Sequence, residues 1–355
     1  MKTHIWLRSE TKPSEERTAL TPESAARMLE AGFQLTVEKS SQSCFSWKEY
    51  ESVGCEIADE HSWYQSAPDN AIILGLKELE ESDSILKRRH IHFAHVYKEQ
   101  AGWQQFLNRF QGDGRLYDLE FLVDENGRRV AAFGHWAGYA GAALAVLAWC
   151  NHQAGRSPVL NPVESRKDQN ALVSEIKSSL DNISKRPRAM VIGGLGRCGK
   201  GAIELLQAVG AEIVSWDMEE TARGGPFDEI LDCDIFLNCV FISESIPPFI
   251  TKSQLKTPDR KLSVICDVSC DPYGTYNPVP VYERCTTFDH PVEVLDDGPK
   301  PLYLIAIDHL PSLLPRESSE DFCNQLMHHL LQLNDLDQSV WKRASDLFDS
   351  KLNLI

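Results

Sequence analysis

The 355-residue sequence lacks the features that identify membrane proteins and many metalloproteins. It has no apolar run long enough to span a bilayer, and its first residues lack the apolar core of a signal peptide. It also has no C-x-x-C pair and no H-E-x-x-H segment, two spacings that hold zinc. We therefore expect a soluble cytoplasmic protein with no metal site.

Positive charge is scarce as well. The chain carries 36 Lys and Arg against 52 Asp and Glu, a formal net charge of −16. A surface of this charge repels nucleic-acid phosphates, so we expect no nucleic-acid partner. A small anionic substrate is still compatible with it, provided that a few basic side chains line the pocket. The ten cysteines lie mostly in apolar segments, and we expect free thiols, as is usual in the cytosol.

The order of apolar and amphipathic segments predicts an α/β fold with parallel sheets. In the first half, the expected strands are 4–8, 33–39, 71–77 and 90–95, and the expected helices are 22–32 and 99–110. The segment "DENG" predicts a turn between two further strand-like runs. The small-residue run 137–150 suits a closely packed helix, 151–169 is an expected loop, and four more strands follow from Arg188. Two α/β domains with a cleft between them are the simplest architecture.

A glycine-rich segment in the second half predicts a dinucleotide site. Gly194, Gly196 and Gly199 satisfy G-x-G-x-x-G between an apolar strand and a helix that starts near Arg197. These glycines permit a tight turn, a close approach of backbone to pyrophosphate and close packing of helix on strand. The N–H groups at the helix start attract phosphates. Asp217 ends the next strand, where a carboxylate binds the ribose hydroxyls and repels a 2′-phosphate, which favours NAD over NADP.

Ionisable residues follow three apolar segments of the first half. Loop 7–22 carries Arg8, Lys12 and Arg17, although a solvated basic loop is the alternative interpretation. Two neighbouring strands end in acid–base groups, namely Lys77, Glu78, His95 and Lys98. Taken singly, His95 is more often a structural histidine. Because α/β proteins bind ligands at the carboxyl ends of their strands, the combination indicates a site.

Nine stretches of the chain resemble the NAD-dependent, lysine-forming saccharopine dehydrogenases of the α-aminoadipate pathway of lysine biosynthesis. The long segments "RGGPFDEI" and "IDHLPSLLPRE" are the most specific. The other matching stretches are "ETKPSEERTALTP", "GLKE", "FAHVYKEQAGWQ", "LYDLEFL", "GRRVAAFG", "GLGRCGKGA" and "NPVPVY". The opening stretch alone is less specific, because alanine dehydrogenases start similarly.

The resemblance implies two Rossmann-like domains with parallel sheets and an interdomain active-site cleft. It assigns residues 1–132 plus 319–355 to a substrate and catalytic domain, because the C-terminal helices return to it. It assigns residues 133–318 to the NAD-binding domain. A monomer is expected.

The resemblance also implies roles for individual residues. Lys77 and His95 match the catalytic pair, and Glu78 and Glu120 match the acids that flank it. The residues that match the substrate site are Arg17, Lys77, Lys98, Gln100, Phe133, Ser269, Cys270 and Asp271. Those that match the NAD site are Arg128, Gly194, Gly196, Arg197, Gly199, Asp217, Thr221, Phe241, Val268, Ile307, Asp308, His309 and Leu310. Two departures are Phe241, where the family has tyrosine, and Cys270, where it can carry alanine.

The family reaction converts saccharopine, NAD and water into lysine, 2-oxoglutarate and NADH. Lys77 can accept the proton of the secondary amine only if its pKa falls well below the free value of ~10.4. Burial and nearby cations lower that pKa, while Glu78 and Glu120 are expected to raise it. His95 suits the proton transfers of hydration. The three carboxylates of saccharopine require basic side chains, for which Arg17, Lys98 and Arg128 are candidates.

Two cysteines of the second half match a pair that can form a disulfide in the family. Cys198 lies in the glycine turn, where a helix N-terminus is expected to lower its pKa. Cys239 ends the strand "DIFLNC", whose carboxyl end should lie beside that turn. We expect both thiols to be reduced in the cell and close enough to pair under oxidation.

Two other functions stay open. An alanine-dehydrogenase-like enzyme would use ammonia and a small keto acid in place of lysine and 2-oxoglutarate. A regulatory NAD-binding protein would have lost catalysis, against which the intact Lys77 and His95 argue.

Overall fold

Two six-stranded sheets form the framework of the computed structural model, which describes residues 2–98, 100–242 and 244–355. The chain divides into two compact units. The first consists of Met1–Ala132 and Pro315–Ile355, and the second of Phe133–Leu314. The expected return to the first unit at residue 319 falls inside a helix that begins at Pro315.

The sheet of the first unit is entirely parallel, with the strand order β3-β2-β1-β4-β5-β6. The strands are β1 (His4–Leu7), β2 (Gln34–Glu38), β3 (Glu56–Ala58), β4 (Ile72–Leu74), β5 (Arg89–His92) and β6 (Arg115–Asp118). The central strands are buried and apolar, for example "IIL" in β4. This is the pattern of a parallel sheet that is covered on both faces.

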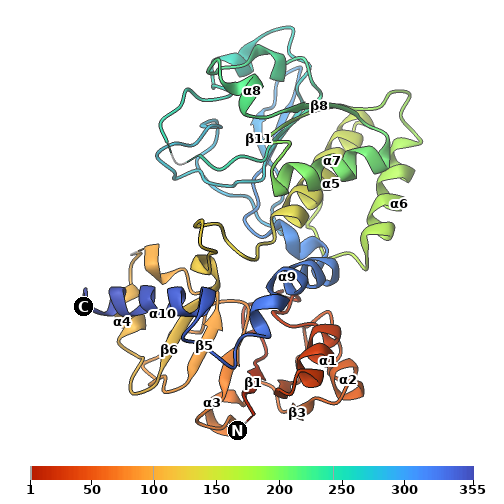
Figure 1. The fold of residues 1–355 in the computed structure, drawn as a ribbon. Helices are drawn as coiled ribbons and strands as arrows, with labels where there is room; N and C mark the ends of the chain where they lie inside the picture. The colour runs from red at the N-terminus through yellow and green to blue at the C-terminus, as the bar shows by residue number, and fades with distance from the viewer. Residues whose placement is uncertain (1, 99, 243) are drawn as a thin grey trace. The chain divides into compact units, whose positions relative to one another are not determined.

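The helices of the first unit come from both ends of the chain. They are α1 (Pro22–Glu30), α2 (Trp47–Ser52), α3 (Trp63–Ser66), α4 (Trp103–Leu107), α9 (Pro315–Leu330) and α10 (Ser339–Leu352), with two 3₁₀ turns at Val96–Lys98 and Leu119–Phe121. Helix α1 begins as the sequence predicts, because the Thr21 side chain accepts a hydrogen bond from the Ser24 N–H and Pro22 occupies the first turn. Helix α10 lies against β6 (Figure 1).

The sheet of the second unit has the order β11-β12-β10-β9-β7-β8, and only its edge strand β11 is antiparallel. The strands are β7 (Arg188–Ile192), β8 (Glu212–Trp216), β9 (Ile235–Asn238), β10 (Val264–Asp267), β11 (Glu293–Asp296) and β12 (Leu302–Ile305). The helices are α5 (Gly134–Gln153), α6 (Gln169–Leu180), α7 (Arg197–Val209) and α8 (Met218–Thr221), with 3₁₀ turns at Asp228–Ile230, Gln254–Lys256 and Leu310–Leu313.

Helices α5 and α7 pack closely through glycine (Figure 1). A Cβ atom at Gly138 would lie 1.8 Å from the carbonyl oxygen of Cys198. On the facing helix, a Cβ atom at Gly201 would lie 1.9 Å from the carbonyl oxygen of His135. The small residues of α5 therefore let two backbones meet, and this contact fixes the start of α7 where the glycine turn ends.

The structure confirms the predicted α/β class with two parallel sheets and corrects several local predictions. The helix expected at 99–110 begins only at Trp103, and Glu99 lies outside the described residues. The turn predicted at "DENG" is present, with the Gly127 N–H donating to the Asp124 carbonyl at 3.1 Å, but the expected strands on its two sides are reduced to an isolated bridge between Val123 and Arg129. The segment after Asp118 forms a 3₁₀ turn instead of continuing the strand.

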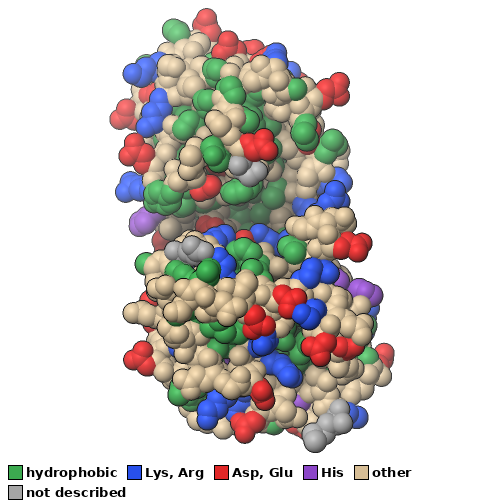
Figure 2. All heavy atoms as spheres, turned by 60° about the vertical axis from the view of Figure 1, so that its left-hand side comes forward, with side chains coloured by type: hydrophobic (Ala, Val, Ile, Leu, Met, Phe, Trp, Pro, Cys, Tyr) green, Lys and Arg blue, Asp and Glu red, His purple; other side chains and the backbone are tan. Residues whose placement is uncertain are grey.

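Neither unit shows a single-signed face in the view of Figure 2. Acidic and basic side chains are interspersed on the visible surface of each unit. Among the described residues, no helix is both long enough and apolar enough to cross a membrane.

Candidate active site

The predicted acid–base residues follow neighbouring strands of the first unit. Lys77 comes after β4, His95 after β5 and Glu120 after β6. Because these strands are parallel neighbours, their carboxyl ends share one edge of the sheet. A cavity of about 420 Å³ at this edge is lined by Glu78, His95 and Gln100 among others. The structure thus brings three predicted residues to one cavity.

The backbone at Lys77 is held by a buried ion pair. The carboxylate of Glu10 accepts hydrogen bonds from the N–H groups of Leu76 (2.7 Å) and Lys77 (2.9 Å). The guanidinium of Arg8 donates to the carbonyl of Lys77 and lies 3.4 Å from Glu10. Burial raises the pKa of Glu10, and Arg8 opposes that shift. No sequence pattern identifies Glu10, because an acid in a basic loop has no characteristic spacing.

The amine of Lys77 lies in a partly buried environment that contains charges of both signs. Burial is the largest cause that lowers its pKa, and the charge of Arg17 lowers it further. The carboxylates of Glu15 and Glu78 raise it. Arg17 is itself buried and donates two hydrogen bonds to Glu15, of 2.7 and 2.6 Å. Glu15, which no sequence pattern identified, therefore raises the pKa of Lys77, the role that was expected of Glu120.

His95 lies between two carboxylates. Its Nε2 atom is 3.9 Å from Glu78 and its Nδ1 atom is 4.0 Å from Glu120. Burial lowers the pKa of His95, while Glu120 and Glu78 raise it. The ring stacks on Phe93 with 5.9 Å between centroids, and the backbone has a φ of 58°. A left-handed conformation is costly for a non-glycine residue and is found most often at functional sites.

Glu120 is held by two cations. Its Oε1 atom lies 3.3 Å from Lys98 and accepts a 2.7 Å hydrogen bond from Arg129. The predicted cation Arg128 is instead exposed in a turn, where its N–H donates to the carboxylate of Asp124. Arg129 was missed in the sequence, because adjacent arginines in a turn cannot be told apart by pattern.

The glycine turn of the second unit has the geometry of a phosphate cradle. Gly193 has a φ of 93°, and a Cβ atom at Gly199 would lie 2.1 Å from the Gly193 carbonyl oxygen. Gly196 precedes α7, and no side chain caps the helix there. A Cβ atom at Gly196 would meet only the Gly193 oxygen, at 3.3 Å. The backbone is therefore tightly packed at Gly193 and Gly199, while space stays open beside Gly196 at the N-terminus of α7.

Asp217 fastens this turn to the end of β8. One carboxylate oxygen accepts a 2.8 Å hydrogen bond from the Leu195 N–H, and the other accepts one of 2.9 Å from Met218. The hydroxyl of Thr221 donates to the Asp217 carbonyl at 2.8 Å. Asp217 therefore shapes the turn in addition to its predicted contact with ribose.

The remaining predicted nucleotide-site residues of the second unit follow other strands at the same edge of the sheet. Phe241 comes after β9 and is 70% exposed, Val268 directly follows β10, and segment 307–310 follows β12. His309 lies against the ring of Phe288, with 4.6 Å between centroids. Phe133 immediately precedes α5, at the start of this unit.

A buried carboxylate organises the segment Ser269–Asp271. Asp267, the last residue of β10, accepts hydrogen bonds from the Tyr282 hydroxyl (2.7 Å) and the Asn238 amide (2.9 Å). It also accepts from the backbone N–H groups of Ser269 (3.1 Å) and Cys270 (3.3 Å). Burial raises the pKa of Asp267, and these donors oppose the shift. The carbonyl of Asp271 then accepts a 3.2 Å bond from Gly274 N–H. No sequence pattern identifies Asp267 as part of this segment's framework.

The cysteines are free thiols in the structure. The prediction of a lowered pKa for Cys198 is wrong, because burial raises its pKa to about 11. Burial also raises the pKa of Cys239. Both side chains pack against the same apolar core, and their pairing under oxidation stays a prediction. A different pair is in contact, since the sulfur of Cys270 lies 3.2 Å from that of Cys285.

Among the described residues, no group of three or more His, Cys, Asp or Glu side chains is arranged to hold a metal ion.

Known proteins are similar over nearly the whole chain. "Saccharopine dehydrogenase [NAD(+), L-lysine-forming]" of Emericella nidulans is 51% identical, with 98% of this chain and 97% of the relative covered. The protein of the same name from Schizosaccharomyces pombe is also 51% identical, with 98% of each chain covered. Residues 6–140 match the family model "Alanine dehydrogenase/PNT, N-terminal domain".

Solved structures show the same fold at low identity. An L-alanine dehydrogenase is similar with a TM-score of 0.66 and 14% identity, covering 97% of this chain and 94% of the other. A transhydrogenase from Sinorhizobium meliloti is similar with a TM-score of 0.59 and 15% identity, covering 94% and 95%.

Proposed function

Because the chain belongs to the family of NAD⁺-dependent, L-lysine-forming saccharopine dehydrogenases, we propose that it converts saccharopine, NAD⁺ and water into L-lysine, 2-oxoglutarate and NADH, and the reverse. The observation that carries this proposal is the identity of about half of all positions over the full length of these relatives. The pathway implied is lysine biosynthesis through α-aminoadipate.

The glycine turn fits NAD⁺. No side chain caps the first N–H groups of α7, and space is open beside Gly196. Both features suit a pyrophosphate, which the N–H groups at a helix N-terminus bind well. Asp217 is placed to accept hydrogen bonds from ribose hydroxyls and to repel a 2′-phosphate. NAD⁺, when bound, accepts a hydride. We propose that Arg197, Thr221, Phe241, Val268 and segment 307–310 complete this site.

Lys77 is the proposed base for the secondary amine of saccharopine. Its lowered pKa increases the neutral fraction of the amine, which is the form that accepts a proton. The bonds from Glu10 and Arg8 hold its backbone, so the side chain is presented from a fixed point. Loss of the amine proton prepares the neighbouring C–H for hydride loss, which leaves a C=N bond.

His95 is the proposed acid–base group for the addition of water to that C=N bond. Its pKa is balanced between burial and two carboxylates, so the ring can both accept and release a proton. Water adds to the carbon, and the resulting C–N bond breaks as the lysine nitrogen gains a proton. Glu78 and Glu120 stabilise the charged ring during these transfers.

The substrate carboxylates require cations and hydrogen-bond donors. Arg17 and Lys98 are proposed for this role, since each lies near enough to a catalytic side chain to lower its pKa. Gln100 lines the cavity beside His95. In the second unit, Phe133 and the segment Ser269–Asp271 are the proposed substrate contacts.

Reductive amination of a small keto acid by ammonia is the competing enzymatic function, favoured by the match of residues 6–140 to the alanine dehydrogenase/PNT family model and by the fold shared with L-alanine dehydrogenase. Oxidation of NADH by the purified protein distinguishes the two. We expect turnover with 2-oxoglutarate plus lysine to be much faster than with pyruvate plus ammonia. Faster turnover with the second pair would reverse the assignment, and NADH binding without turnover would support a regulatory protein.

We further propose that the protein acts as a monomer in the cytoplasm. The resemblance to its family supports the monomer, and its composition supports the location. Light scattering at micromolar concentration tests the first point, for which a mass near 40.0 kDa is expected.

A further inference from the structure

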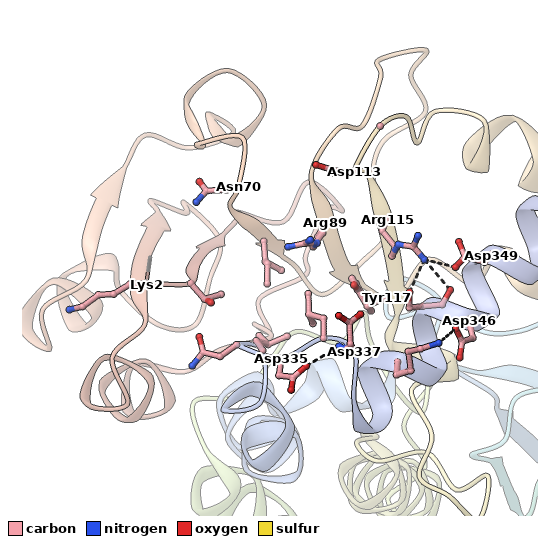
Figure 3. A pocket seen from close by; sticks show the side chains of 18 residues that line it. Lys2, Asn70, Arg89, Asp113, Arg115, Tyr117, Asp335, Asp337, Asp346 and Asp349 are labelled. Atoms are coloured by element: carbon pink, nitrogen blue, oxygen red, sulfur yellow. Dashed lines mark hydrogen bonds and ion pairs between the residues drawn. The ribbon is translucent and has the colours of Figure 1, made fainter.

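The first unit contains a second cavity, at the amino ends of its strands. Its volume is about 640 Å³ (Figure 3). The first residues of β4, β5 and β6 line it together with the segment 333–337 and helix α10. Lys77 and His95 follow the carboxyl ends of the same strands, so this cavity lies at the opposite edge of the sheet from the candidate acid–base groups.

A buried phenol borders the cavity. Tyr117 is only 2% exposed, and its ring meets the edge of Trp341 with 5.8 Å between centroids. Within residues 2–98, 100–242 and 244–355, no group forms a hydrogen bond with its hydroxyl. The Tyr117 hydroxyl is therefore available to a polar group that enters the cavity.

The charged residues around the cavity divide into paired and unpaired ones. Arg115 donates to Asp349 (2.8 Å) and to the Ser345 hydroxyl (2.6 Å), and Lys342 pairs with Asp346. These pairs largely neutralise one side of the cavity.

Arg89 and Asp337 have no such partners. In the described part of the chain, neither side chain forms an ion pair or hydrogen bond. Both lie near the same phenol, because the charge of Arg89 lowers the pKa of Tyr117 and that of Asp337 raises it. Figure 3 shows the three side chains around the same part of the cavity. The guanidinium of Arg89 and the carboxylate of Asp337 thus line the same cavity without forming an ion pair with each other.

We propose that this cavity binds a small zwitterion, an α-amino acid. The guanidinium of Arg89 suits the carboxylate of the ligand, and the Tyr117 hydroxyl donates a further hydrogen bond to it. Asp337, with Asp335 beside it, suits the ammonium group. The lining side chains comprise four cationic and five anionic residues. A simple anion would face the five carboxylates and a dication would face the four cations, whereas a zwitterion matches both.

The test uses L-leucine as the probe, with two analogues that each lack one charge. Binding to the full-length protein is measured by calorimetry for L-leucine, for 4-methylpentanoate, which lacks the ammonium group, and for 3-methylbutylamine, which lacks the carboxylate. We expect L-leucine to bind more tightly than either analogue by about tenfold or more, since each analogue loses one charge-assisted contact.

Variants locate the binding. Arg89→Gln and Asp337→Asn are expected to weaken leucine binding by about tenfold, and Tyr117→Phe by a smaller factor. Lys87→Gln, which changes an exposed residue outside the lining, is the matched control and should bind leucine normally. Lys77→Met should also retain binding, which separates this cavity from the catalytic site. Leucine binding that survives Arg89→Gln and Asp337→Asn, equal binding of an analogue, or no leucine binding at millimolar concentration would overturn the proposal.

Discussion

The carboxylate of Glu10 accepts a 2.9 Å hydrogen bond from the backbone N–H of Lys77, so a buried acid of β1's loop fixes the residue proposed as the catalytic base. The variant Glu10→Gln keeps the shape but presents an amide to N–H donors. Loss of a buried hydrogen bond costs about 1–3 kcal/mol, and we expect kcat to fall by about tenfold with NADH affinity unchanged. Steady-state kinetics and NADH fluorescence titration measure the two quantities.

The control for this prediction is Glu60→Gln. Glu60 also accepts a hydrogen bond from a backbone N–H, that of Ser41 at 2.8 Å, but in an exposed loop. The kcat of Glu60→Gln should equal that of the unchanged protein. An equal loss in both variants would mean that Glu10 has no specific role in positioning Lys77.

Lys77→Met removes the proposed proton acceptor and keeps a long apolar side chain. We expect kcat to fall by about 10²- to 10⁴-fold, the usual contribution of a general base, while NADH affinity stays nearly unchanged. Lys39→Met, at an exposed lysine paired with Asp59, is the control. A near-normal rate for Lys77→Met at every pH would show that another group takes the proton.

The order of strands and helices along both halves could be predicted from the sequence, because hydrophobic residues recur with different periods in strands and in amphipathic helices. Lys77 and His95 could also be found, because each stands at the carboxyl end of a strand that the hydrophobic pattern predicts. Glu10, Glu15 and Asp267 could not, because each acts through a hydrogen bond that only the folded backbone creates. The pKa of Cys198 was mispredicted because burial outweighs the helix dipole there.

Glu78→Gln should change the pH dependence of saccharopine oxidation. Glu78 raises the pKa of both Lys77 and His95, so its neutralisation lowers both. Lys77 must be unprotonated to accept a proton, and the rate therefore rises with pH through its pKa. We expect the acidic limb of the kcat/KM profile to move to lower pH. Glu80→Gln, at a neighbouring exposed residue, is the control, and a shift to higher pH in Glu78→Gln would contradict the assignment.

Asp217 holds the glycine turn through the Leu195 N–H and is the proposed partner of the ribose hydroxyls, and two variants separate these roles. Asp217→Asn keeps an oxygen that can accept from the Leu195 N–H but removes the charge, so NADP should bind better relative to NAD. Asp217→Ala also removes the acceptor, and it should weaken binding of both cofactors by loosening the glycine turn. Glu219→Gln, in exposed α8, is the control. Unchanged KM values for both cofactors in both variants would show that Asp217 does not face the ribose.

Mass spectrometry of the product formed from L-lysine, 2-oxoglutarate and NADH tests the central claim most directly. The account predicts saccharopine, in which the two substrates are joined through a secondary amine with loss of water, and the oxidation of one NADH for each molecule formed. Lys77→Met should form it far more slowly. The absence of this product, together with alanine formed from pyruvate and ammonia, would contradict the account.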